Sequence, residues 1–419
     1  MAKTVTHTRV VILGGGFGGV RAAMDLAKSG SRSLDITLIS AKPHFEYYPT
    51  MYKVVTGRST AQVCVPLAEL FHNSKVNVVE DYITEIDLEA RLLKGGIGSP
   101  YGYDYLILAP GSETGYFNLP GLPDVSYGFK SIQEALALRK HLYETVAPVA
   151  ADAPPEQRVI NNHFMVVGAG PTGVELSAEL VRYGKELAVS RGTDPSLVTV
   201  DLVEASPRVL PTFPPEVSAI VEKRLHSLGV NIFTNRNVTK ADVENLYLKD
   251  MTVRTRTIVW SAGVSSNRLL KAIKGLELDK RGRVVVDGHL QAKGHKGVFV
   301  IGDAASTQYA GLAQTANSDA SFAAYAVLSA ASKKPLPTYV AHKPIYAVPT
   351  GHGWAAVVWG PFRFYGRFGG ILRELADLRY FLGILPPHRA LRMLMKGNEK
   401  SRNCAVCAHH EEIHAIAAA

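Results

Sequence analysis

The sequence is poor in cysteine and has no long apolar run. Its 419 residues include three cysteines, Cys64, Cys404 and Cys407, which are too few for a disulfide framework and suit a reducing compartment. No uninterrupted apolar stretch reaches the about 18–20 residues that a bilayer-spanning helix needs. The first apolar strand begins near Arg9, so we expect no signal or transit peptide. These absences argue against a disulfide-stapled secreted domain and against a membrane-spanning protein.

Negative charge is also scarce. The chain has 46 Lys and Arg against 37 Asp and Glu, which gives a formal net charge of +9. This excess favours an anionic partner, either a membrane surface or nucleic acid. The remaining composition is that of a globular protein, with 47% hydrophobic and 20% charged residues, and the length allows two or three domains with cores of their own.

A glycine-rich turn follows the first apolar strand. Gly14, Gly16 and Gly19 form G-x-G-x-x-G between the strand "RVVIL" and the helical pattern "VRAAMDLAKSG". In this context the glycines allow a tight turn, close approach of a pyrophosphate, and packing of the helix on the strand. The free N–H groups of the helix N-terminus also attract phosphate. The turn therefore predicts a dinucleotide site.

The same pattern recurs in the middle of the chain. Gly168, Gly170 and Gly173 again lie between a strand and a helix, in "VVGAGPTGVELSAEL". The next strand ends in Glu204, which is suited to bind a ribose diol and to repel a 2′-phosphate, so NADH is favoured over NADPH. After the first loop the corresponding strand ends in Ser40, with Lys42 nearby as a phosphate contact. Two loops predict two dinucleotides, most simply a bound FAD and a diffusing NADH.

Ordered motifs over about residues 8–345 resemble the two-dinucleotide-domain flavoproteins of the glutathione-reductase type, and more closely the type II NADH dehydrogenases. These motifs are "GGGFGG", "YLILAPGS", "GAGPTGVELSAEL", "LVEASPRVLP", "WSAGV", "VFVIGDAA" and "LAQTA". The resemblance implies a single-subunit, non-proton-pumping NADH:quinone oxidoreductase with non-covalent FAD at the first loop and NADH at the second. It also implies a quinone pocket near "AQTANS".

The resemblance assigns site residues in three groups. The implied FAD contacts are Gly14, Gly16, Phe17, Gly18, Gly19, Ser40, Lys42, Pro49, Ile83, Ala109, Gly111, Asp303 and Ala313. The implied NADH contacts are Gly168, Gly170, Pro171, Thr172, Gly173, Glu175, Glu204 and Gly263. The implied quinone contacts are Gln314 and Ser318, and Gln314 and Glu175 carry the catalytic roles.

Three positions depart from the family's pattern. The quinone motif is usually A-Q-x-A-x-Q, and here Ser318 replaces the second glutamine. A strand end that usually reads A-T-G is Ala109-Pro110-Gly111, and Ser40 stands where an acid is usual. These departures bear on the quinone bound and on the ribose contact of FAD.

Glu175 follows closely on a loop built to attract anions. Its place two residues after Gly173 predicts a first-turn acid, whose ionised form the helix dipole stabilises. The resemblance implies instead a role at the nicotinamide, in positioning its carboxamide and in the proton balance of the reduced flavin. A plain helix-start acid is the alternative.

The stretch 361–402 is basic and amphipathic. It holds nine Lys or Arg against three Asp or Glu. Its large apolar residues form one helical stripe: Ile371, Leu372, Leu375, Leu378 and Leu382. Arg373, Glu374 and Asp377 lie mostly away from this stripe, and Pro386-Pro387 is expected to end the helix. We expect this region to bind an anionic membrane surface, which places the protein peripherally on the cytoplasmic face. The alternatives are that the stripe packs on the protein's own core or forms a homodimer interface.

Other functional classes have less support. No motif for nucleic-acid recognition is present. Sulfide:quinone oxidoreductases and disulfide reductases need redox cysteines that this sequence does not offer near the first loop. The open alternatives are a rubredoxin- or ferredoxin-type reductase, and an NADH-dependent flavoprotein reductase or redox sensor whose acceptor is a protein or oxygen. The tail "CAVCAHHEEIH" has one C-x-x-C, too little to predict a metal site.

The expected fold is α/β with two Rossmann-like dinucleotide-binding domains and a C-terminal amphipathic region. The FAD domain is expected to be discontinuous, at residues 1–120 and 282–345. The NADH domain is expected at residues 121–281. The C-terminal region for membrane association or dimerisation is expected at 346–402, and a tail at 403–419.

Overall fold

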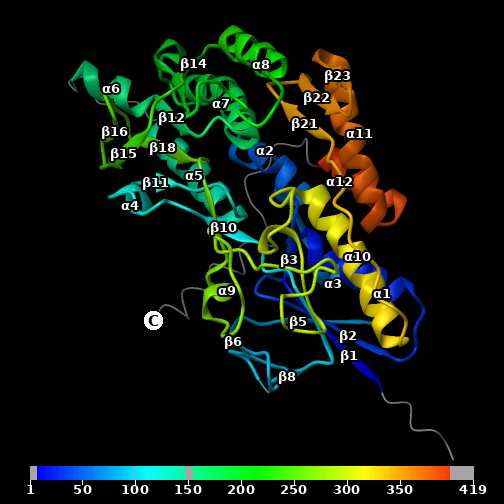
Figure 1. Ribbon diagram of the computed structural model, residues 1–419. Coiled ribbons are helices and arrows are strands. Elements are labelled where there is room, and N and C mark those ends of the chain that lie inside the picture. Colours follow the sequence, from blue (N-terminus) through cyan, green and yellow to red (C-terminus); the bar gives the residue numbers. More distant parts are fainter. Residues whose placement is uncertain (1–6, 99, 147–153, 397–419) are drawn as a thin grey trace, which may run out of the picture. The chain divides into compact units, whose positions relative to one another are not determined.

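The computed structural model describes residues 7–98, 100–146 and 154–396. The chain forms two compact units, which are considered separately (Figure 1). The first comprises Met1–Tyr47, Cys64–Glu113 and Ser265–Pro344, and the second Tyr48–Val63, Thr114–Val264 and Ile345–Ala419. The chain changes unit after Tyr47, Val63 and Pro344, and also within β10 (Ser112–Thr114) and β19 (Val264–Ser266).

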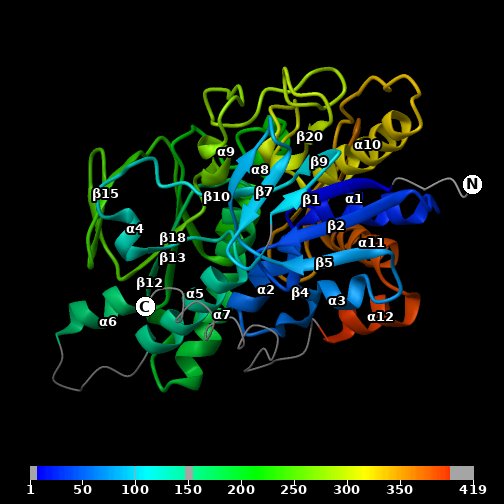
Figure 2. The same cartoon turned by 90° about the horizontal axis from the view of Figure 1, so that it is seen from below.

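The first unit is built on a five-stranded parallel sheet in the order β20-β9-β1-β2-β5. Its strands are β1 (Thr8–Leu13), β2 (Leu34–Ser40), β5 (Val76–Glu80), β9 (Tyr105–Leu108) and β20 (Val298–Val300). In Figure 2, β1, β2 and β5 lie side by side. The helices α1 (Phe17–Lys28) and α10 (Ala313–Ala331) pack against each other. The unbroken apolar run of β1 is buried, as a strand covered on both faces requires.

Smaller elements complete the first unit. Two small antiparallel sheets are β3-β4 and β6-β7-β8. Their bounds, with those of the short helices, are β3 (His44–Glu46), β4 (Cys64–Pro66), β6 (Ile83–Asp87), β7 (Leu92–Gly95), β8 (Tyr101–Gly102), α3 (Leu67–Leu70), α9 (Arg268–Ala272) and η4 (Gly302–Ala304). Leu270 and Ile273 pack in the same core as Val11 and Leu13. That packing explains why the chain rejoins this unit at Ser265, earlier than the expected 282.

The second unit repeats the parallel sheet, in the order β11-β18-β12-β13-β14. Its strands are β11 (Ser126–Tyr127), β12 (His163–Val167), β13 (Thr199–Val203), β14 (Val230–Phe233) and β18 (Thr257–Trp260). Further elements are α4 (Leu122–Val125), α5 (Ile132–Thr145), α6 (Pro155–Asn161), α7 (Pro171–Ser190), η3 (Pro195–Leu197), α8 (Pro215–Leu228) and the antiparallel β15 (Val238–Ala241), β16 (Asn245–Leu248) and β17 (Thr252–Arg254). Each unit thus has the doubly wound core that two glycine loops predict, and the fold expectation is confirmed.

Two segments distant in sequence join the second unit. The stretch 48–63 carries η1 (Tyr48–Thr50), α2 (Met51–Val55) and η2 (Thr60–Gln62), and α2 packs on α5 and α7. The C-terminal part carries β21 (Tyr346–Pro349), β22 (Ala355–Trp359), β23 (Phe362–Phe364), α11 (Gly366–Ile384) and α12 (Pro387–Lys396). Figure 1 shows α11 beside β22 and α12. The helix break at Pro386-Pro387 is where the sequence predicts it.

In α11, the predicted amphipathic helix, apolar side chains face solvent and two charged side chains face the protein, the reverse of a helix that packs on a core. The side chains of Ile371 and Leu375 are 54% and 52% exposed, and Leu382 is also exposed. Arg373 and Asp377 are buried instead. The alternative that the stripe packs on the protein's own core is therefore wrong for these three residues within the described chain. None of the described helices combines the length and apolar character needed to cross a bilayer.

Candidate functional site

The first glycine loop follows β1 and opens α1. Gly14 has φ +117°, and a Cβ there would lie 2.1 Å from the Ala109 carbonyl oxygen. A Cβ on Gly19 would lie 1.8 Å from the Gly14 carbonyl oxygen. At Gly16, the N-cap of α1, a Cβ would meet nothing within 4 Å. Two glycines therefore serve close packing, while the third leaves backbone facing open space where an anion can approach.

The second loop has the same geometry. Gly168 has φ +99°, and a Cβ there would lie 2.5 Å from the Ala262 Cα. A Cβ on Gly173 would lie 1.8 Å from the Gly168 carbonyl oxygen, and at Gly170, the N-cap of α7, it would meet nothing within 4 Å. Pro171 and Thr172 form the first two positions of α7. Both loops therefore fit a dinucleotide phosphate.

Glu204 braces the second loop. Its carboxylate accepts hydrogen bonds from the Ala169 N–H at 2.7 Å and from the Ser206 N–H at 2.8 Å. The predicted acid thus stands beside the glycines, at the end of β13. Gly263 lies against Phe117, where a Cβ would be 2.3 Å from the ring. Their contacts with NADH stay predictions.

The predicted FAD residues near the first loop are held by local contacts. The Ser40 hydroxyl donates to the Lys42 carbonyl at 2.7 Å, and Lys42 Nζ donates to Glu46 at 2.7 Å. A ribose or phosphate contact by these two side chains must therefore compete with existing partners. Glu46, which the sequence analysis missed, is buried beside His44, and these two partners hold its pKa below the usual range despite burial. Its place four residues after Lys42, at the end of the short strand β3, carries no distinctive signal.

The remaining predicted FAD residues are spread over both units. Gly18 packs on Ile301, and Phe17 is buried. Asp303 in η4 accepts a hydrogen bond from the Ser112 hydroxyl at 2.5 Å, so it lies beside the Ala109–Gly111 turn. Ile83 is buried in the apolar core of its unit, so its side chain serves packing. Pro49 belongs to the second unit.

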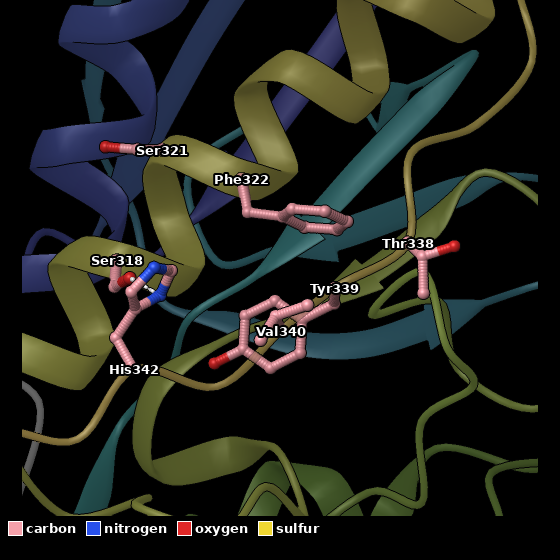
Figure 3. A pocket seen from close by; sticks show the side chains of 7 residues that line it. All are labelled: Ser318, Ser321, Phe322, Thr338, Tyr339, Val340 and His342. Atoms are coloured by element: carbon pink, nitrogen blue, oxygen red, sulfur yellow. Dashed lines mark hydrogen bonds between the residues drawn. The ribbon is translucent and has the colours of Figure 1, made fainter.

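The predicted quinone residues lie on α10. Ala313 begins the helix, and Gln314 and Ser318 are one turn apart on it. Ser318 lines a cavity of about 460 Å³, together with Ser321, Phe322, Thr338, Tyr339, Val340 and His342. Figure 3 shows the Ser318 hydroxyl facing the His342 ring, 3.5 Å from its Nδ1. Tyr339 closes one side through its ring contact with Phe322 and its hydrogen bond to Asp319.

Glu175 differs from its expected setting in two ways. Because α7 begins at Pro171, its first turn contains no acid and Glu175 falls in the second turn. The helix dipole was expected to favour the ionised carboxylate. Instead, loss of water around the partly buried group raises its pKa to about 8, opposed by Arg373 and supported by Asp377. The expectation was wrong because desolvation outweighs a dipole that acts mainly over the first turn.

One of the three cysteines lies in the part of the chain that the structure describes. Cys64 is buried in β4, and Cys404, Cys407 and the histidines near them lie outside that part. Among the side chains that the structure describes, no cluster of three or more His, Cys, Asp or Glu is arranged for a metal.

Known proteins resemble the chain in sequence and in fold. The family model described as pyridine nucleotide-disulphide oxidoreductase matches residues 8–320. A type II NADH:quinone oxidoreductase of Mycobacterium tuberculosis is 32% identical over 401 residues, covering 90% of this chain and 84% of that protein. One from Staphylococcus haemolyticus is 30% identical over 302 residues, covering 70% and 74%.

Two solved structures show the fold. NDH2 from Plasmodium falciparum, in complex with NADH, has a TM-score of 0.83 at 19% identity and covers 94% of this chain and 100% of its own. The sulfide:quinone oxidoreductase from Aquifex aeolicus has a TM-score of 0.75 at 18% identity, with coverage of 93% and 92%. At these identities the likenesses establish the architecture alone.

Proposed function

Because this chain belongs to the type II NADH:quinone oxidoreductases, within the pyridine nucleotide-disulphide oxidoreductase family, we propose that it oxidises NADH and passes two electrons to a quinone. FAD is its bound cofactor and NADH its substrate. The observation that carries the proposal is the pair of glycine loops, each with an open central glycine at the N-terminus of a helix, Gly16 and Gly170.

The protein's part is to bind and orient two nucleotides. When bound, FAD supplies the ability to accept a hydride from NADH and to release electrons to a second acceptor. The loop around Gly16 would hold its pyrophosphate, with Asp303 beside it at the strand ends. The loop around Gly170 would hold NADH, and the negative charge of Glu204 would disfavour NADPH.

Proton balance gives Glu175 its proposed role. Oxidation of NADH releases two electrons and one proton equivalent as hydride, so reduction of a quinone to quinol takes up one further proton from solvent. With a pKa of about 8, the Glu175 carboxyl holds a proton at neutral pH. It can therefore donate a hydrogen bond to the nicotinamide carboxamide and keep a proton in reserve.

Rapid kinetics tests the proposed cycle. Purified protein is mixed with NADH, then with a short-chain quinone, and the flavin absorbance is followed. We expect fast reduction, and reoxidation by quinone that is faster than reoxidation by oxygen. Fast reduction with no response to quinone would remove the quinone and leave a protein acceptor or oxygen. Ser318→Gln, which restores the family's usual residue, is compared on the same quinones to assign the α10 cavity.

We also propose that α11 and α12 seat the protein on an anionic membrane surface, on the cytoplasmic side. On α11, exposed apolar residues follow helical spacing: Phe368, Ile371, Leu375 and Leu382. On α12, Leu391 and Met395 are exposed one turn apart. Exposed arginines on the two helices are Arg367, Arg379, Arg389 and Arg392. An apolar stripe with a basic surround suits the headgroup region of a bilayer.

Vesicle binding tests this surface. The wild-type protein should sediment with vesicles that contain an anionic lipid, more weakly at high salt, and less with zwitterionic vesicles. Ile371→Gln combined with Leu375→Gln should reduce binding about tenfold or more, because two exposed apolar side chains are lost. Val243→Gln, at an exposed apolar residue outside these helices, is the matched control. Loss of dimers rather than of vesicle binding in the double variant would favour a homodimer interface.

A further inference from the structure

The buried face of α11 contains a pair of opposite charges. The face toward the protein comprises Gly369, Arg373, Asp377, Phe381 and Ile384. Arg373 Nη1 donates a hydrogen bond to Asp377 Oδ1, one helical turn away, and the two side chains are only 11% and 5% exposed. Gly369 allows this close seating, since a Cβ there would lie 2.2 Å from the Ala355 carbonyl oxygen. An ion pair is therefore held where apolar side chains would be usual.

Stability does not account for this pair. Taking two charges out of water costs several kcal/mol per ion, and well-packed apolar residues often replace such pairs without loss. A cation that precedes an anion by four residues is also the less favourable order on a helix. A task beyond holding α11 in place is thus the better explanation.

Arg373 links α11 to the segment that precedes α2. Its Nη2 donates a hydrogen bond to the Pro49 carbonyl at 3.0 Å, and α2 in turn packs on α7, the helix that carries Glu175. Three segments that are remote in sequence are therefore joined in the second unit: α11 (366–384) contacts the segment that begins at residue 48, and α2 in that segment packs on α7 (171–190).

The charged and titratable groups facing this region come from all three helices. They are Tyr52 and Lys53 on α2, Glu179 on α7, and Arg373, Glu374 and Asp377 on α11. Of these, Arg373 and Asp377 act directly on Glu175, and they act in opposite directions. The Glu179 carboxylate accepts a hydrogen bond from Arg182 Nη2 at 2.8 Å.

We propose that Arg373 and Asp377 are positioning residues for Glu175, which use their opposite charges to set the pH at which its carboxyl gains and loses a proton. The inference rests on the proposed function, in which Glu175 holds the reserve proton. Arg373 stabilises the ionised carboxylate of Glu175. Asp377 repels that carboxylate and, through its ion pair, also offsets part of the positive charge of Arg373. The pair thus keeps the carboxyl close to the point where it exchanges a proton near neutral pH.

Opposite charges predict opposite shifts. Arg373→Met removes the cation and leaves Asp377, so the midpoint of Glu175 titration should rise by about 1 pH unit or more. Asp377→Asn leaves the arginine unopposed, so the midpoint should fall by about 1 unit. Arg373→Lys keeps the charge and should restore most of the wild-type midpoint.

The midpoint is read from the infrared carbonyl stretch of protonated carboxylic acids, recorded against pH on the FAD-loaded enzyme. The band that disappears in Glu175→Gln belongs to Glu175. Arg379→Met, which removes an exposed arginine from the same helix, is the matched control and should leave the midpoint unchanged. Thermal unfolding is measured for every variant, so that a shifted midpoint is not confused with a misfolded protein. If a single variant does not fold, it is replaced by the double variant Arg373→Met/Asp377→Asn, which leaves neither charge unpaired.

Opposite shifts in the two single variants, with none in the control, would support the inference. Midpoints within about 0.3 unit of the wild type, shifts of the same sign, or no titrating Glu175 band would overturn it. Because the infrared midpoint does not depend on the acceptor, an enzyme that fails to reduce quinone but shows opposite shifts would lose the proposed function and keep the positioning role.

Discussion

A methyl group added at Gly170 should separate the binding of NADH from the folding of its loop. Gly170 has φ −69° and ψ −178°, an extended conformation that alanine adopts freely, and its Cβ would enter open space. Alanine is a poorer N-cap than glycine, and it also lowers the entropy of the unfolded chain. These effects are of similar size, so Gly170→Ala should change the free energy of unfolding by less than about 1 kcal/mol.

Gly173 offers the contrast within the same loop. Its Cβ would lie 1.8 Å from the Gly168 carbonyl oxygen, which is backbone and cannot rotate away. Forcing an extra methyl into a packed position costs about 1–3 kcal/mol or more. Gly173→Ala should therefore destabilise the second unit, whereas Gly170→Ala should raise the KM for NADH about tenfold, equivalent to about 1.4 kcal/mol.

The assay combines denaturant unfolding with flavin reduction at varied NADH concentration. Gly16→Ala, the counterpart in the first loop, should retain stability of the apo-protein and lose FAD instead. The reasoning would be refuted by a Gly170→Ala protein that binds NADH normally, or that is destabilised as much as Gly173→Ala. Either result would mean that the phosphate does not approach the backbone at the open glycine.

Three further changes should have effects of predictable sign. Glu204→Gln removes a negative charge and one of two acceptors that brace the loop, so the preference in kcat/KM for NADH over NADPH should fall about tenfold. The folded-state pKa of Glu175, about 8, lies above its ordinary value of 4.5, so wild-type stability should fall as pH rises from 4.5 through 8 and then level off. Glu175→Gln should flatten that dependence in thermal unfolding between pH 5 and 9, and equal slopes would contradict the raised pKa. Arg373→Met/Asp377→Asn should be more stable toward denaturant than either single variant, because each single change leaves a buried charge unpaired; a double variant weaker than both would argue that the pair stabilises the fold.

Much of the fold could be predicted from local pattern. The apolar runs of β1 and β12, the G-x-G-x-x-G turns and the helices after them are contiguous in sequence, and short-range sterics decide them. The helix break at Pro386-Pro387 follows equally from the chemistry of one residue type. The limits of the two units are harder to predict from the sequence, because Leu270 and the segment 48–63 pack with residues that are distant along the chain.

The candidate site divides in the same way. Glycine positions and Glu204 were predictable, since each stands at a fixed offset from a strand. Ser40 and Lys42 were assigned to the nucleotide from their place after a strand, whereas the hydrogen bonds from the Ser40 hydroxyl to the Lys42 carbonyl and from Lys42 Nζ to Glu46 are visible only in the structure. Periodicity found the stripe on α11 without deciding whether it faces solvent or protein, because a helical repeat is the same in either case.

The sequence by itself thus determined the two glycine loops between strand and helix and the family, both of which depend on residues close together along the chain. Tertiary structure alone decided that Arg373 and Asp377 turn inward while Ile371 and Leu375 stay exposed. It also decided that burial raises the pKa of Glu175 to about 8. The physical reason is that a pKa depends on the water a group loses and on the charges around it, and here the two charges come from α11, which is far from Glu175 in the sequence.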